Sequence, residues 1–103
     1  MPENNTTELV RIFHLTTGGT PIIAKSRFYG AWALDDPLYL LYYRDETGEE
    51  RIQVNNVTAF AATNTIEIKD ENVLFCYLPN PNILSHYNDT LLKRLEPLTD
   101  DED

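Results

Sequence analysis

The chain is poor in cysteine, in basic residues and in long apolar runs. It has 103 residues with one cysteine, and 8 Lys and Arg stand against 17 Asp and Glu. A single cysteine cannot form an internal disulfide, which predicts folding in a reducing compartment. No apolar stretch approaches the length of a membrane span, and no basic segment followed by an apolar run opens the chain. We therefore expect a cytoplasmic protein with no membrane partner.

The shortage of basic residues leaves a formal net charge of −9 at pH 7. A field of this sign repels phosphates, so it argues against general nucleic-acid binding. Four of the acids occupy the last positions, 100–103, and subtracting them from −9 leaves −5 for the body of the chain. The body therefore retains room for a locally basic pocket.

Groupings of residues that could carry catalysis are also lacking. The two histidines are His14 and His86, and Ser85 adjoins His86 on a predicted helix, where neighbouring residues do not face each other. The acidic tail lacks the spaced ligands and glycine of a calcium loop, and Gly18-Gly19 lacks a surrounding phosphate-binding motif. We therefore predict no enzyme, no metal and no cofactor.

What the chain does contain is enough apolar material for one folded domain, at 42% hydrophobic residues. Residues 1–7 are polar and are predicted to be disordered. Residues 8–96 are predicted to form the domain, with a β region over 8–78 and a helix over 81–95. Residues 97–103 form an acidic tail.

The β region consists of short apolar or alternating runs divided by turn residues. Gly18-Gly19 and the segment 45–50 predict hairpin turns. Gly30 predicts a bend or bulge within one strand, and Asp35-Asp36-Pro37 predicts an interruption. We expect five or more strands in meander order. The expected strand segments are 9–15, 20–29, 31–34, 38–44, 51–54, 57–61, 65–69 and 73–78.

The helix is predicted from its start and its spacing. Asn80 is available as the N-cap and Pro81 suits the first helical position. One face then carries apolar residues at helical spacing, namely Leu84, Tyr87, Leu91 and Leu95. This stripe favours packing on the chain's own β region. The alternatives are that the helix caps a ring or recruits a partner.

Two segments of the chain resemble the signatures of the Sm-like superfamily. The first signature is matched in spacing by Asp35, Leu38, Tyr39 and Leu40, and the second by Ile68, Lys69, Asp70 and Val73. The chain is also similar to Sm-like proteins predicted in tailed phages of marine bacteria, which implies a host cytoplasm if it is viral. The resemblance implies an all-β fold, namely a small, strongly bent five-stranded Sm-like (SH3-like) barrel with a C-terminal helix.

The resemblance also implies assembly of copies of the chain into a ring of six or seven subunits. In Sm-like rings the strand after the second signature pairs with a strand of the next subunit. This assigns the oligomer interface to Val73, Leu74, Phe75, Cys76 and Tyr77.

The resemblance implies a non-enzymatic ring that binds single-stranded RNA weakly or acts as an RNA chaperone. The residues nearest the family site are Tyr39 and Lys69, with Asp36 and Asp70 shaping it. Tyr39 could stack on a base and Lys69 could contact a phosphate. Because Lys69-Asp70 replaces the family's Arg-Gly pair, the alternative is a structural or protein-interaction ring with a decayed RNA site.

Overall fold

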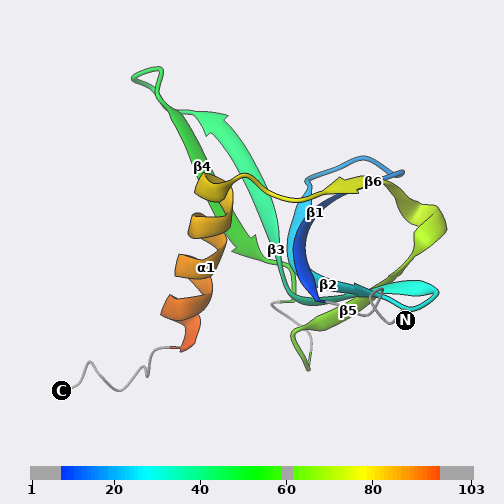
Figure 1. The fold of residues 1–103 in the computed structure, drawn as a ribbon. Coiled ribbons are helices and arrows are strands. Elements are labelled where there is room, and N and C mark those ends of the chain that lie inside the picture. The colour runs from blue at the N-terminus through cyan, green and yellow to red at the C-terminus, as the bar shows by residue number, and fades with distance from the viewer. Residues whose placement is uncertain (1–7, 59–61, 96–103) are drawn as a thin grey trace.

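The computed structural model describes residues 8–58 and 62–95, so the predicted N-terminal segment and acidic tail lie outside the described residues. The described chain is a mostly β domain with one antiparallel sheet and a C-terminal helix (Figure 1). No described helix is long and apolar enough to cross a membrane. The elements are β1 (Leu9–Leu15), β2 (Ile22–Phe28), β3 (Ala31–Arg44), β4 (Glu50–Asn56), β5 (Thr65–Lys69), the short 3-10 helix η2 (Asp70–Asn72), β6 (Val73–Tyr77) and α1 (Pro81–Leu95).

The strands follow the order β4-β3-β2-β1-β6, and β5 pairs with β3 outside this path. The first four strands form the predicted meander. β5 and β6 depart from it, because β5 pairs with β3 rather than with β4, and β6 returns to pair with β1. The long strand β3 pairs with β5 through its first half and with β4 through its second half. The sheet therefore curls strongly in its middle, and the β3–β4 hairpin projects from it (Figure 1).

Gly30 closes a turn between two strands, so the prediction of one bent strand across it is wrong. Its φ of 95° lies in the left-handed region that glycine adopts at little cost. Phe28 on β2 pairs with Trp32 on β3 across this turn. The described sheet has six strands, which agrees with the prediction of five or more.

Asp35-Asp36-Pro37 does not interrupt the chain's longest strand, which corrects a second prediction. β3 continues through it, with Asp36 at a φ of 51° and a register shift against β2 between Ile23 and Lys25. A bulge of this kind bends a strand and tolerates proline. The bend lets β3 change partner from β5 to β4. At 57–61, Val57 and Thr58 form a turn instead of the predicted strand, and the remaining positions lie outside the described residues.

Apolar side chains are buried on both faces of the sheet, because neighbouring residues of a strand point to opposite sides. We call the face around Phe13 the inner face and the face around Ile12 the outer face. The inner cluster contains Phe13, Ile22, Ala24 and Leu34. The outer cluster contains Ile12, Ile23, Leu38 and Tyr87. The central strands therefore carry apolar runs rather than a simple alternation.

The helix α1 covers part of the outer face, which confirms the predicted helix and its packing on the chain's own sheet. It begins as predicted, since the Ile83 amide donates to Asn80 Oδ1 at 2.9 Å. Tyr87 is fully buried, and its hydroxyl donates to the Asp36 carbonyl at 2.9 Å. The same hydroxyl accepts from the Lys25 amide at 3.3 Å. Tyr87 thus fastens the helix to the bend in β3.

Candidate functional site

The strand β6 forms an apolar edge of the sheet. Among the described residues it pairs with β1 alone, so its other edge has no strand partner. The apolar side chains exposed on β6 and directly after it are Leu74, Phe75, Tyr77 and Leu78. Exposed apolar edge strands are rare in proteins that remain monomeric, because they offer a template for another strand. This edge is the strongest candidate for a functional site.

A bulge at Leu74 decides which way the β6 side chains point. His14 pairs with Phe75, whereas the next residue of β1, Leu15, pairs with Val73, which leaves Leu74 as the extra residue. Val73 and Cys76 pack against the inner cluster. Leu74 is 61% exposed. The bulge therefore adds an apolar contact to an edge that is already open.

Three rings lie stacked on the outer face beside this edge. The ring centroid of His14 is 4.6 Å from that of Phe75 and 5.4 Å from that of Tyr77. His14 Nε2 also lies 2.8 Å from the Tyr77 hydroxyl. We call His14, Phe75 and Tyr77 the aromatic strip. The contact of His14 with Phe75 could not be predicted from the sequence, because it depends on pairing between the two ends of the β region.

The strand β5 provides a second open edge. Among the described positions it pairs with β3 alone. Its residues Ile66 and Ile68 pack against the inner cluster. The three residues of η2 connect β5 directly to β6, and the Thr16 amide donates to the Asn72 carbonyl at 2.9 Å. The two open edges therefore belong to one fixed part of the molecule.

Cys76 lies on the inner side of β6 and is half-buried. Burial raises the pKa of its thiol, and the charge of Asp70 adds to this rise while Arg11 opposes it. A raised pKa keeps the thiol protonated and weakly nucleophilic at neutral pH. Cys76 is therefore a packing residue of the inner face.

The residues predicted to bind RNA do not form a single cluster. Tyr39 pairs with Asn55 in the second half of β3, whereas Lys69 pairs with Ala31 at the start of that strand. Asp36, at the bend between them, contacts Lys25 Nζ at 3.4 Å.

Asp70 adjoins Lys69 at the end of β5, and it accepts a hydrogen bond from the Trp32 indole at 3.0 Å. The structure therefore brings Lys69 and Asp70 together, and it places Tyr39 apart from them.

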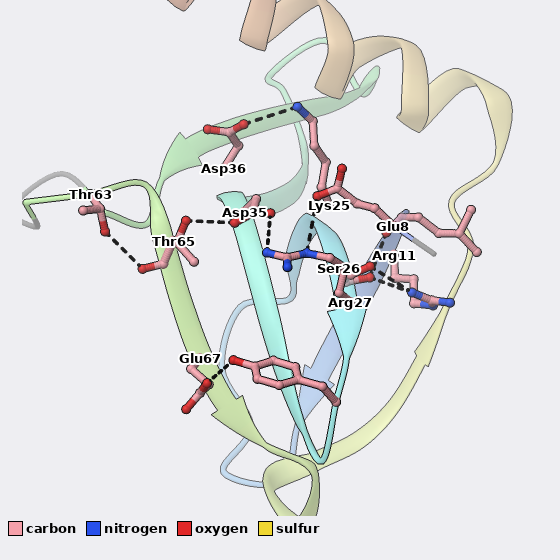
Figure 2. Close-up of polar contacts among 12 residues, drawn as sticks. Glu8, Arg11, Lys25, Ser26, Arg27, Asp35, Asp36, Thr63, Thr65 and Glu67 are labelled. Atoms are coloured by element: carbon pink, nitrogen blue, oxygen red, sulfur yellow. Dashed lines mark hydrogen bonds and ion pairs between the residues drawn. The ribbon is translucent and has the colours of Figure 1, made fainter. Parts of the chain in front are cut away.

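A polar network on β2, β3 and β5 fastens the sheet near its bend (Figure 2). Asp35 accepts from Arg27 Nη2 at 3.1 Å and from Thr65 Oγ1 at 2.8 Å. Burial alone would raise the pKa of Asp35, but the hydrogen bonds from Thr65, Glu8 and Arg27 together lower it. The hydrogen bond to Asp35 raises the pKa of Glu8. These contacts join β2, β3 and β5 next to the bend.

No protein-family model matches the chain, and no curated protein matches its sequence. Within residues 8–58 and 62–95, no three His, Cys, Asp or Glu side chains are grouped so that they could hold a metal ion. A functional inference therefore depends on the structure itself.

Proposed function

We propose that this protein is a non-enzymatic, Sm-like assembly module whose copies join by pairing β6 of one subunit with β5 of the next. The observation that carries the proposal is the pair of open strand edges on one curved sheet. Backbone hydrogen bonds along such a junction would satisfy groups that one chain leaves without strand partners. The resemblance in Sm-like signatures supports a ring of six or seven subunits.

The side chains of the two edges are compatible with this pairing. β6 directs Val73 and Cys76 inward, and β5 directs Ile66 and Ile68 inward. A β5 strand placed beside β6 would therefore extend the apolar inner face without a break. On the outer side, Lys69 of the incoming strand would approach the aromatic strip, where its ammonium group could lie over an aromatic ring.

The two edges are different surfaces, so the junction is head-to-tail. Repeated head-to-tail contacts generate either a closed ring or an open filament, and the rotation between subunits decides between them. β5 and β6 lie on opposite sides of the strongly curled sheet, and η2 joins them (Figure 1). A turn at each junction favours closure, which supports the ring.

Assembly is better supported than RNA binding as the main activity. The net charge of −9 opposes phosphate binding, and Tyr39 lies apart from Lys69 along β3. This corresponds to a structural or protein-interaction ring with a decayed RNA site. RNA binding by Lys69 remains a separate prediction that the same assembly can test.

The test is the solution mass measured by light scattering, for the unaltered chain and for two matched variants. Leu74 on β6 and Leu92 on α1 are both 61% exposed, so lysine at either position changes a comparable surface. We expect the unaltered chain and Leu92→Lys to form the same oligomer. Leu74→Lys should be monomeric, because a charge on an edge strand opposes pairing.

A monomeric unaltered chain, or an oligomer that survives Leu74→Lys, would contradict the proposed junction. Adding short uridine-rich RNA at low salt tests the second prediction. A gain in mass that Lys69→Ala abolishes would support RNA binding at this end of β5, and no gain would support a purely structural ring.

A further inference from the structure

The β3–β4 hairpin presents a face that takes no part in the proposed junction. Its strands pair without a register break from Leu38 opposite Asn56 to Arg44 opposite Glu50. Side chains therefore alternate strictly between its two faces. Leu40 and Val54, on one face, pack against the outer cluster beneath α1. The opposite face carries a different set of residues.

That opposite face consists of three cross-strand pairs, which we call the tyrosine ladder. Its pairs are Tyr39 with Asn55, Leu41 with Gln53 and Tyr43 with Arg51. Tyr39 is 38% exposed and Tyr43 is 48% exposed. Exposed tyrosines offer a large, stiff surface with a polar tip, which makes them effective contact residues.

The ladder has no unpaired charged side chain, which suits a neutral ligand. Its single charged residue, Arg51, is neutralised by Asp45 at 2.8 Å and by Glu49 at 3.0 Å. The chain as a whole has a net charge of −9, which repels nucleic acids and acidic polysaccharides. A neutral ligand would meet no such repulsion, and the ladder offers no free charge to attract an ion.

The polar groups of the ladder match a ligand rich in hydroxyl groups. Gln53 Nε2 donates to Asn55 Oδ1 at 3.2 Å. This bond leaves the Gln53 carbonyl oxygen and the Asn55 amide hydrogens without another partner among the described residues. A hydroxyl group can donate to the first and accept from the second. Together with the two phenol groups, these side chains form a polar row beside the rings.

We propose that the tyrosine ladder binds a neutral oligosaccharide. Sugar rings combine an apolar C–H surface, which packs on phenol rings, with hydroxyl groups that fit the amide pair. Tyr39 and Tyr43 are separated by roughly 13 Å, at about 3.3 Å per residue of strand. This distance suits a ligand of several sugar units rather than a monosaccharide. The site goes beyond the proposed assembly, which uses the edges of β5 and β6.

The experiment adds each oligosaccharide probe stepwise to the unaltered protein. NMR chemical shifts of the backbone amides are recorded at each step. The probes are cellohexaose, maltohexaose and chitohexaose as neutral oligosaccharides, with an oligouridylate and a heparin hexasaccharide as anionic controls. We expect at least one neutral probe to shift the amides of the ladder strands. The anionic probes should leave them unchanged. Failure of all three neutral probes to bind would overturn the proposal.

Tyr43 and Tyr42 provide matched variants, because they adjoin on β3 and point to opposite faces of the hairpin. Tyr42 is 63% exposed and borders the cleft between the hairpin and α1. Tyr43→Ala should weaken binding of the neutral probe roughly tenfold or more, which is the loss expected for a central aromatic contact. Tyr42→Ala should bind it unchanged.

A loss with Tyr42→Ala, or unchanged binding with Tyr43→Ala, would overturn the assignment to the ladder. Circular dichroism checks that both variants fold. If Tyr43→Ala does not fold, Gln53→Ala replaces it, since that side chain is exposed and its removal should also weaken binding. Light scattering on the same samples keeps the two proposals separate, because an oligomer can form without binding sugar and a monomer can still bind it.

Discussion

The outer face of the sheet has two apolar parts, one covered by the helix α1 and one exposed to solvent. Under α1, Ile12 and Ile23 are covered by the helix and its buried Tyr87. Beyond α1, Phe75 and Tyr77 of the aromatic strip stay exposed. Both parts consist of apolar side chains on one face of a single sheet. The difference indicates that the chain covers this face only as far as α1 reaches, and leaves the β6 side exposed.

The largest expected effect is the loss of assembly when the exposed strand β6 is altered. Phe75→Pro should convert the oligomer to a monomer, because proline removes a backbone donor from the edge strand. Light scattering measures the mass, and the fluorescence of Trp32, which packs against the inner cluster, reports folding. A folded Phe75→Pro protein that remained oligomeric would exclude this strand as the interface.

The next largest effect is a difference in stability loss between substitution of a buried tyrosine and of an exposed one. Tyr87→Ala should lower the free energy of unfolding by about 3–5 kcal/mol, because it empties a buried site. Tyr77→Ala should lower it by less than about 1 kcal/mol, since Tyr77 is exposed. Urea unfolding of both variants in the Leu74→Lys background avoids a contribution from assembly. Equal losses would show that the two parts do not differ in this way.

A smaller effect concerns the start of the covering helix. Asn80→Ala should lower the free energy of unfolding by about 0.5–2 kcal/mol, because it removes the acceptor for the Ile83 amide. Asn82→Ala is the control, since this exposed residue lies inside the helix. Thermal unfolding measures both. Equal destabilisation by the two substitutions would argue against Asn80 as the cap.

The smallest expected effect is the pH dependence of the rate at which the Cys76 thiol is alkylated. Burial raises its thiol pKa above the ordinary value of 9.0. The folded protein therefore favours the protonated thiol. The contribution of this group to the free energy of unfolding is present below about pH 9 and is lost as pH rises past the folded-state pKa. Alkylation by iodoacetamide should therefore be slow at neutral pH and accelerate in alkaline buffer.

Assembly should slow this alkylation further, because a neighbouring strand would cover β6. At one alkaline pH, we expect the Leu74→Lys monomer to react several-fold faster than the unaltered oligomer. Mass spectrometry of timed samples measures the two rates. Identical rates would contradict coverage of β6 in the assembly.

Local patterns predicted most of the individual elements. Three features lie where the sequence predicted them: the strand Leu9–Leu15, the glycine pair after it, and the helix Pro81–Leu95 with its cap. These features depend on neighbouring residues. Turn glycines, alternation and N-caps act within a few positions, so a pattern in the chain is enough to identify them.

The errors occurred where a distant strand decides the outcome. Gly30 and Asp36 both adopt positive φ, but the first closes a hairpin and the second bends a continuous strand. The sequence around each allows either result. What separates them is pairing: on either side of the bend, β3 pairs with residues about 20 to 30 positions further along the chain, Asp35 with Thr65 of β5 and Leu38 with Asn56 of β4.

The sequence alone therefore determined a mostly β domain with a capped amphipathic helix, an acidic charge and a set of apolar runs. Only the tertiary structure decided which of those runs became covered. Phe75 and Leu38 both lie in apolar strands, yet Leu38 is buried beneath α1 and Phe75 lies at an open edge. The physical reason is that burial depends on which surfaces the curl of the sheet and the direction of the helix bring together, and these contacts join residues far apart in the chain.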